Sequence, residues 1–502
     1  MAQKYIPGQI IIAFKDSALG EAPAPGPALP PAAAGVRPLV RRALLLLANV
    51  RFDFAATRVD TMFRVAKRVV EPTDPPAGGG PLTPALSDFI AFAQAATPPK
   101  PQLDAHANVR AICRKYIRVI MPESNVRAAL EYVRKYPSLI EYAERVPARY
   151  FLPLAAANQG GGGADNGDPE PPGEDTVVST PWSHSRVGWV ESTRKQWESA
   201  GAPNVRNIAV LDSGFDEKHL GLQGLVKSGN SDANVDPWGH GTAVASIICS
   251  HAGTFHNKYM RGGFLPAAKT KLLMYKVSAE GTPVTGITFP VDFDLYMTVI
   301  AHLTECRAAN RAAEHASGEF HIRVVNMSFG GPECSFTETA LLRKAHEAGL
   351  HLVACAGNRD GAADDSTRTW FPAALTTVTS VGALQQQGKR WEKSKYSHPY
   401  REGKVAVDLT APGTSIEGAW PVTGASLIHN SKLSAFQASI WLDGSSFAAP
   451  FVTAAAALLF EKEKSNAPKG KDIHDKLRGA YAQDANEEGT GAGVLNVSNL
   501  KP

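Results

Sequence analysis

Three short segments carry residue types that could act together in nucleophilic catalysis. Asp212 follows an apolar run, His240 stands between two glycines, and Ser446 opens an apolar stretch rich in alanine. A serine hydroxyl becomes a nucleophile when a histidine accepts its proton and a carboxylate orients that histidine. Taken singly, each residue has a more ordinary interpretation: a turn aspartate, a capping or core histidine, and an N-cap serine. Their joint occurrence favours the chemical interpretation.

The segments that must position these residues alternate between apolar runs and helical stretches. Helices are predicted at 240–250 and 337–348, and strands at the runs 208–211, 271–277, 322–326, 350–356, 378–381 and 405–409. This alternation predicts an α/β fold, in which a parallel sheet is covered by helices on both faces. Functional groups in such sheets lie at the carboxyl ends of the strands, and Asp212 stands at one of them.

The chain order Asp, His, Ser resembles that of the subtilisin-like serine proteases, or subtilases. The resemblance covers about residues 207–496 and includes the later landmarks Ala411-Pro412-Gly413 and Gly491 to Asn496. Ser445 stands where the family usually has threonine. Two further segments resemble the family's substrate-binding strand and its oxyanion segment, and they contain Ser328, Phe329, Gly330, Ala356, Gly357 and Asn358.

This resemblance implies a serine endopeptidase that works through an acyl-enzyme. His240 would take the proton of Ser446, and Asp212 would fix the imidazole tautomer and stabilise the imidazolium. Asn358 and the amide of Ser446 would hold the oxyanion. The substrate would be a protein or peptide that pairs, in extended form, with residues 328–330.

Three other positions bear on specificity and on metals. Trp370 aligns with a wall of the family's primary specificity pocket, where it either narrows the pocket or packs in the core; both interpretations stay open. Arg359 follows the oxyanion asparagine and is interpreted as a solvated surface charge rather than a site for acidic substrates. Gly221 occupies the place of a calcium-binding aspartate in many secreted relatives, so neither a metal nor a cofactor is expected.

The chain divides into an N-terminal unit at 1–155, a Gly/Pro-rich linker at 156–180, and a catalytic unit at 181–502. Segments 5–15, 125–133 and 137–142 resemble the β-α-β pieces of the subtilase inhibitor prodomain, which implies a small α+β (ferredoxin-like) domain that lies across the active site. The alternative is an unrelated α+β adaptor. Pro/Ala-rich stretches at 22–34 and 72–84 are interpreted as insertions.

The tail of this prodomain is expected to enter the active site. By analogy with relatives, counting without gaps from Pro137 places Phe151 in the primary pocket and the scissile bond before Leu152. A pocket narrowed by Trp370 would not admit Phe151. Either one of these two expectations is wrong, or the bond is cut slightly later, between Leu152 and Ala157, where small residues begin. Self-cleavage is therefore expected somewhere within residues 150–159.

Composition excludes several other classes of protein. A net charge of +4 over 502 residues, without a long basic run, gives no reason to expect a nucleic-acid partner. The start of the sequence lacks the pattern of a secretory signal, and no membrane helix is predicted. Five widely separated cysteines favour reduced thiols in a cytoplasmic protein, and Cys355 is interpreted as a packing thiol.

Two competing functions remain. A regulatory pseudoprotease would hold a peptide in the same groove without cutting it, although an intact triad with its oxyanion asparagine argues against that role. An esterase of the α/β-hydrolase type would need Gly-x-Ser-x-Gly with the serine ahead of the histidine in the chain. The order here is the reverse, and the physiological substrate cannot be deduced from these motifs.

Overall fold

A computed structural model of the protein describes residues 4–15, 58–61, 115–151, 155–156, 180–199, 201–230, 232–255, 258–279, 289–310, 313, 319–359, 366–401, 403–421, 439–466, 468–483 and 488–502. The two Pro/Ala-rich insertions, most of the linker, and Cys113 lie outside these residues. The unit boundaries at 155 and 180 stay predictions.

A parallel sheet forms the centre of the second unit, as the sequence predicts. In the described residues it has nine strands in the order β20-β21-β17-β16-β15-β13-β7-β11-β8, and only the β20 and β21 pair is antiparallel. The strands are β7 (Val205–Asp212), β8 (Val226–Ser228), β11 (Thr270–Lys276), β13 (Val324–Met327), β15 (His351–Cys355), β16 (Thr379–Leu384), β17 (Leu409–Pro412), β20 (Ala482–Gln483) and β21 (Val494–Leu495).

One predicted strand is displaced. The run 405–409 is not a strand of the sheet, since β17 begins only at Leu409. Val405 is 44% exposed and makes an isolated bridge to Ser397, so the first part of this apolar run lies on the surface.

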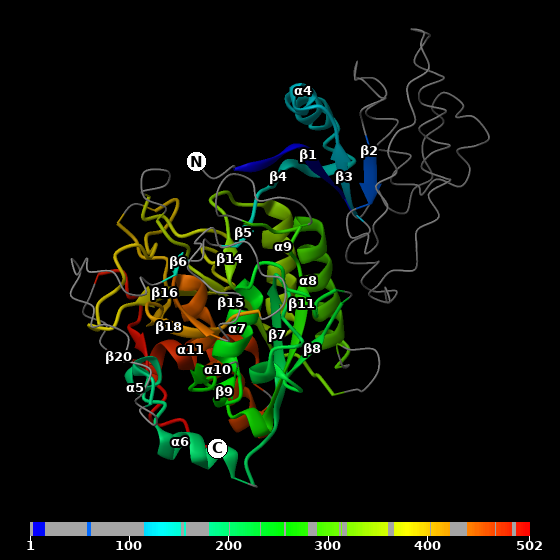
Figure 1. Cartoon of the computed structure of the whole chain (residues 1–502). Helices are drawn as coiled ribbons and strands as arrows, with labels where there is room; N and C mark the ends of the chain where they lie inside the picture. The colour runs from blue at the N-terminus through cyan, green and yellow to red at the C-terminus, as the bar shows by residue number, and fades with distance from the viewer. Residues whose placement is uncertain are drawn as a thin grey trace.

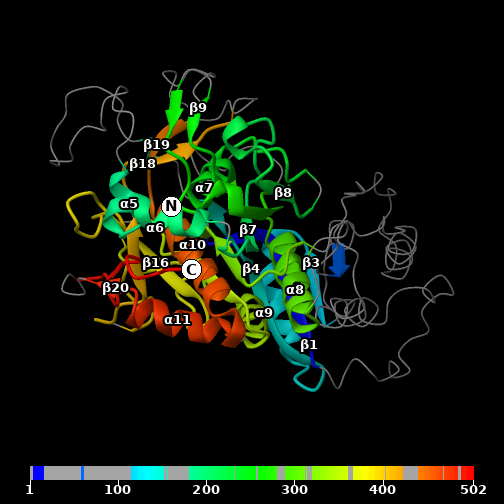
Figure 2. The same cartoon turned by 90° about the horizontal axis from the view of Figure 1, so that it is seen from below.

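Helices cover both faces of the sheet. Alternate residues of its strands point to opposite sides, so each face presents apolar side chains that pack against helices. In β7, Ile208 and Val210 join one core cluster, whereas Ala209 and Leu211 join the other. The first cluster packs against α7 (His240–Ile248), α10 (Ser445–Lys462) and α11 (Gly470–Gly479), and the second against α8 (Phe293–Ala308) and α9 (Phe336–Glu347) (Figures 1 and 2).

Smaller elements surround this core. They are α5 (Trp182–Arg186), α6 (Glu191–Glu198), β9 (Gly253–Phe255), β10 (Lys258–Met260), β12 (Phe289–Pro290), β14 (Phe329–Gly330), β18 (Ile416–Ala419) and β19 (Ser439–Asp443). Short 3₁₀ turns occupy Leu220–Leu222, Ala267–Lys269 and Lys464–Asn466. Within the described part of the chain, every helix is too short or too polar to cross a membrane.

The first unit is an antiparallel sheet with one described helix, which agrees with the predicted α+β domain. Its strands are β1 (Tyr5–Phe14), β2 (Arg58–Thr61), β3 (Tyr116–Ile120) and β4 (Ile140–Pro147), in the order β2-β3-β1-β4, and α4 (Glu123–Val133) connects β3 to β4.

The first unit packs against the second through the sheet face opposite α4. Figure 1 shows this sheet above α8 and α9, with α4 on its outer side. Ile11 and Ala13 of β1 belong to the same core cluster as α8 and α9. Since these side chains are fully buried, the two units share one continuous apolar interface.

The chain leaves β4 and enters the second unit as two short strands. β5 (Tyr150–Phe151) lies between β12 and β14 and pairs antiparallel with both. β6 (Ala155–Ala156) then pairs with β19, just before α10 begins. Residues 152–154, which join these strands, lie outside the described residues.

Candidate active site

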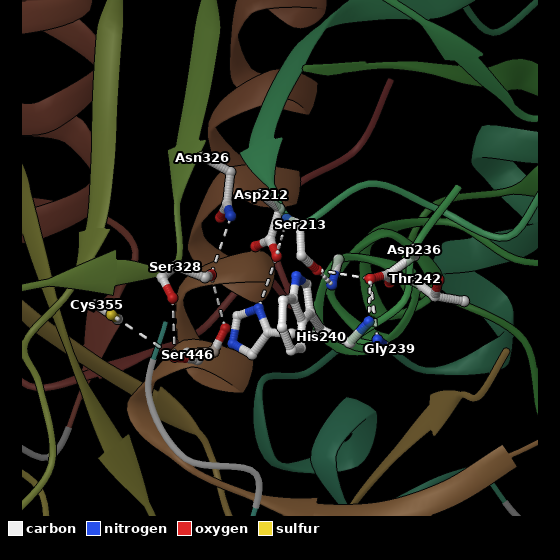
Figure 3. A network of polar contacts seen from close by, with 12 residues as sticks. Asp212, Ser213, Asp236, Gly239, His240, Thr242, Asn326, Ser328, Cys355 and Ser446 are labelled. Atoms are coloured by element: carbon white, nitrogen blue, oxygen red, sulfur yellow. Dashed lines mark hydrogen bonds and ion pairs between the residues drawn. The ribbon is translucent and has the colours of Figure 1, made fainter. Parts of the chain in front are cut away.

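Asp212 and His240 come together at the carboxyl edge of the sheet. Asp212 is the last residue of β7, and His240 is the first residue of α7. The imidazole Nδ1 lies 2.7 Å from Asp212 Oδ1, and the Ser213 amide donates to the same oxygen at 2.8 Å (Figure 3). Both side chains are fully buried. This geometry fixes the imidazole with Nδ1–H facing the carboxylate and Nε2 facing away.

Gly239 allows the turn that brings His240 to this place. Its φ of +80° lies in the left-handed region, which residues with a Cβ avoid. A Cβ at Gly239 would also lie 2.5 Å from the ring of Trp420, which is too close. Backbone conformation and space therefore both require glycine before the histidine.

Asp236 organises the same turn from inside. Its Oδ1 accepts hydrogen bonds from Ser213 Oγ at 2.8 Å and from the Gly239 amide at 2.9 Å, and its Oδ2 accepts from the Thr242 amide at 2.8 Å and hydroxyl at 2.7 Å. Burial raises the pKa of the Asp236 carboxyl, and the hydrogen bonds from these donors partly offset that increase. The sequence analysis did not assign this role to Asp236. The available signal was its position, four residues ahead of His240.

Ser446 lies beside the imidazole, on the second residue of α10 (Figure 3). Its Oγ donates to the Ser328 carbonyl oxygen at 3.0 Å. Within the described residues, His240 Nε2 has no hydrogen-bond partner. Gly444 is the N-cap of α10, so the N-cap interpretation of Ser446 is wrong. The positive end of the α10 dipole favours negative charge on the atoms near this serine.

Cys355 fills the space behind Ser446. Its Sγ lies 3.8 Å from Ser446 Oγ, and it is buried. Burial raises the pKa of this thiol to about 12, so the thiolate required for redox chemistry is not formed near neutral pH. These properties favour the packing interpretation of Cys355.

Asn358 is clamped by the residue just before Ser446. Ser445 donates to Asn358 Oδ1 through its amide at 3.0 Å and its hydroxyl at 2.8 Å, while the Gly357 amide donates to the Ser445 hydroxyl at 3.1 Å. Because the carbamoyl oxygen is held, the Nδ2 donors are left for an anionic ligand. A serine at position 445 thus supplies the hydroxyl that this clamp needs.

Trp370 fills the space between the two glycines of the predicted substrate-binding segments. A Cβ at Gly330 would lie 3.2 Å from Trp370 Cβ, and one at Gly357 would lie 3.1 Å from the Trp370 ring. The ring is buried and has the Lys395 ammonium 5.6 Å from its centroid. Both interpretations of Trp370 therefore fit, since it packs in the core and also occupies space between Gly330 and Gly357.

Phe151 does not lie in the pocket beside Trp370, so that expectation was wrong. The β5 and β14 register sets Phe151 opposite Phe329, and its ring lies 5.4 Å from the His240 ring and 5.7 Å from the Phe329 ring. Phe151 belongs to the core cluster opposite the one that contains Trp370. Counting without gaps placed the tail incorrectly, and the apparent conflict with Trp370 disappears.

Gly221 and Arg359, the two remaining predicted positions, make hydrogen bonds to neighbouring parts of the chain. The Gly221 amide donates to His219 Nδ1 at 3.1 Å. The Arg359 amide donates to the Lys393 carbonyl oxygen at 2.7 Å, and its guanidinium reaches the Glu392 carbonyl oxygen at 3.5 Å. Across the described ranges, no three His, Cys, Asp or Glu side chains are grouped to hold a metal ion.

Comparison with known proteins identifies the family. Residues 206–496 match the model of the subtilase family, Peptidase_S8. Because this match covers more than half of the chain, the chain belongs to the subtilase family.

Individual relatives agree with this assignment. Subtilisin amylosacchariticus from Bacillus subtilis subsp. amylosacchariticus is 28% identical over 59% of this chain and 65% of its own length. Subtilisin BL from Lederbergia lenta is 26% identical over 64% of this chain and 97% of its own length. The crystal structure of fervidolysin from Fervidobacterium pennivorans, a keratinolytic enzyme related to subtilisin, has a similar fold, with a TM-score of 0.60 and 19% identity over all of this chain and 62% of that one.

The contacts of Asp236 predict that Asp236→Asn destabilises the protein. The amide oxygen can replace one carboxylate oxygen, but the NH2 group then faces donors that have lost their acceptor. At about 1–3 kcal/mol for each buried donor left unpaired, the two Thr242 donors predict a loss of about 2–6 kcal/mol. Chemical denaturation of the Ser446→Ala form, which removes interference from proteolysis, measures this loss. An unchanged unfolding midpoint would show that Asp236 does not organise the turn.

Proposed function

We propose that the protein is a serine endopeptidase that hydrolyses peptide bonds with Ser446 as nucleophile. The observation that carries this proposal is the buried pair of Asp212 and His240, whose Nδ1 to Oδ1 distance is 2.7 Å, with the unpartnered Nε2 beside Ser446. For Nε2 to accept its proton, the Ser446 side chain must turn away from the Ser328 carbonyl oxygen, to which its Oγ donates at 3.0 Å. Membership of the subtilase family supports the same assignment.

The reaction proceeds in two halves. Ser446 Oγ bonds to the peptide carbonyl carbon as its proton passes to His240 Nε2, and Asp212 stabilises the imidazolium. Nε2 then gives this proton to the leaving amine as the C–N bond breaks, which leaves an acyl-enzyme. In the second half, a water molecule gives a proton to His240 as its oxygen bonds to the ester carbonyl carbon. This proton passes to Ser446 Oγ as the ester C–O bond breaks, which releases the acid and restores the serine.

The oxyanion is held by the Asn358 Nδ2 donors and by the Ser446 amide. Removing one such donor typically costs about 100- to 1000-fold in rate. The clamp on Asn358 Oδ1 keeps the side chain oriented before substrate arrives, so little reorganisation is needed in the transition state.

The proposed substrate is an extended stretch of protein or peptide, bound as an additional strand. β5 illustrates this mode, since its backbone pairs with β12 on one side and with β14 on the other. Main-chain hydrogen bonds of this kind recognise an extended chain whatever its side chains are, and pockets add specificity.

The first unit is proposed to act as an intramolecular inhibitor, so that the protein is made as a zymogen. Its tail enters the second unit as β5, which pairs with β14, and as β6, which pairs with β19, and the Phe151 ring packs on the His240 ring. Glu144 of β4 accepts hydrogen bonds from the amides of Phe336 and Thr337 at the start of α9, at 2.8 and 3.0 Å. A carboxylate at a helix N-terminus is stabilised there, so this contact holds the first unit in place.

A cytoplasmic location also remains a proposal. Cys249, Cys334 and Cys355 are thiols without disulfides, as expected of a reducing compartment.

A peptide-binding pseudoprotease is the alternative function. None of the contacts within the described site favours it, because binding alone does not need a buried carboxylate that orients an imidazole.

Ser446→Ala is predicted to abolish peptide hydrolysis without unfolding the protein. Loss of a triad nucleophile lowers kcat by about 10⁶-fold, whereas loss of the hydrogen bond to Ser328 costs only about 0.5–1.5 kcal/mol. Hydrolysis assays and thermal melts of the purified variant measure both effects. Retained turnover in a preparation free of other proteases would contradict the triad assignment.

Self-processing is predicted within residues 150–159, because β5 lies beside His240 and β6 pairs with β19, which ends three residues before Ser446. N-terminal sequencing of the mature fragment locates the cut, and the Ser446→Ala chain is expected to stay intact. A mature N-terminus inside 22–34 or 72–84, or processing of the Ser446→Ala chain when purified alone, would point to a separate activating protease.

Activity is predicted to survive chelation of divalent metals. Gly221 has no carboxylate to offer to a cation, and its amide is already bonded to His219. The initial rate of peptide hydrolysis is therefore expected to be the same within about twofold in EDTA and in added calcium. Loss of activity in EDTA that calcium restores would show that other residues bind a required ion.

A further inference from the structure

A buried ion pair joins the tail of the first unit to the second unit. Arg149 Nε lies 2.9 Å from Glu338 Oε1, and Arg149 Nη2 lies 2.6 Å from Glu338 Oε2. Both side chains are 0% exposed. Nη2 also donates to the Glu333 carbonyl oxygen at 2.8 Å, and the guanidinium lies 5.9 Å from the centroid of the Phe293 ring. The paired, two-point contact matches the planar geometry of a guanidinium.

Arg149 occupies the groove in the same way as a substrate residue would. It directly precedes β5, and its carbonyl oxygen accepts the Val291 amide at 2.8 Å, next to the pairing of β5 with β12. In an extended chain, side chains two residues apart point to the same side. Arg149 and Phe151 share a side, where Phe151 packs on the His240 ring and Arg149 enters the second unit.

Glu338 is not needed to cap its own helix. Its position, three residues after the N-cap Ser335, predicts a capping box in which its side chain would bind back to the start of α9. Glu144 caps the helix instead, since its carboxylate accepts hydrogen bonds from the Ser335 hydroxyl at 2.9 Å and from the amides of Phe336 and Thr337. The Glu338 carboxylate is thus available for a cation in the groove, and the positive end of α9 favours its negative charge.

Departure of the tail would leave this carboxylate without its cation. A substrate that covers the carboxylate again would bury its charge, and an unpaired buried charge is strongly unfavourable. A chain that brings a replacement cation is therefore favoured over one that does not. We propose that Glu338 forms a subsite selective for arginine, and that the enzyme prefers protein segments with arginine two residues ahead of the residue opposite Phe329. This inference rests on the proposed endopeptidase function and specifies its substrates. Lysine, which offers a single ammonium, binds less well than arginine.

The first experiment varies only the substrate. Quenched fluorescent peptides reproduce residues 147–156, with arginine, lysine, leucine or citrulline at the position of Arg149, and are given to the self-processed wild-type protein. Citrulline keeps the shape of arginine but has no charge. The expected kcat/KM is at least about 30-fold higher for arginine than for citrulline. Equal kcat/KM for these two peptides would overturn the subsite and leave the endopeptidase function intact.

The second experiment varies the protein. Glu338→Gln is expected to remove most of the preference for arginine over citrulline, measured as the ratio of kcat/KM for the two peptides. Glu333→Gln is the matched control, because this nearby carboxylate binds Lys4 and Tyr5 by its side chain and meets Arg149 only through its backbone. An ion pair that only anchors the tail would leave the preference of the processed enzyme unchanged in both variants. If the Glu338→Gln protein does not process itself, the comparison of arginine and citrulline peptides with the wild-type protein still tests the subsite.

A third readout needs no catalysis. Full-length protein carrying Ser446→Ala and Arg149→Ala has a cavity facing Glu338, and methylguanidinium fits the place of the lost guanidinium. Stabilisation in thermal melts by methylguanidinium, beyond that by neutral methylurea, and its loss on adding Glu338→Gln, supports the subsite even if no peptide is ever cut. Failure of hydrolysis together with this stabilisation would reject only the endopeptidase function. Equal melting temperatures in methylguanidinium and in methylurea would reject the subsite.

Discussion

The hydrogen bond between Asp212 and His240 joins two fully buried side chains, one at the end of a strand and the other at the start of a helix. It requires β7 to end at the sheet edge, and it requires a left-handed Gly239 ahead of α7. Asp236 holds this turn from within. The third element, α10, packs across the same sheet and sets Ser446 beside the ring. β7, α7 and α10 each contribute one side chain of the triad, so their packing in a shared core sets the geometry of the site.

Burial of this site depends on the first unit. Phe151 covers the imidazole, Arg149 neutralises Glu338, and Glu144 replaces the cap that Glu338 does not supply. Burial lowers the pKa of Arg149, but the charge and hydrogen bonds of Glu338 more than offset this, so the pKa is raised. In the proposed zymogen, the residues of the first unit that block the site are those that a substrate must replace. The proposed inhibitory role and the proposed specificity therefore depend on the same contacts.

The sheet, the helices beside the site, and the meeting of Asp212, His240 and Ser446 could be predicted because short motifs follow strands or begin helices. Contacts between distant segments could not. Phe151 was misplaced because tail spacing gives no strand register, and only the pairing with Phe329 fixes it. The ion pair of Glu338 with Arg149 could not be predicted either, since the two residues stand 189 positions apart in the sequence. The strand expected at 405–409 begins only at Leu409, because the start of this run, at Val405, lies on the surface.

The central claim is that Ser446 is a nucleophile activated by His240. Its most direct test is a fluorophosphonate probe applied to the self-processed protein, followed by peptide mass spectrometry, with His240→Ala, processed by added protease if necessary, as the control. A single adduct on Ser446, at least 100-fold slower to form in the control, is the predicted result. No adduct in the processed wild type, or one on a different serine, would contradict the account.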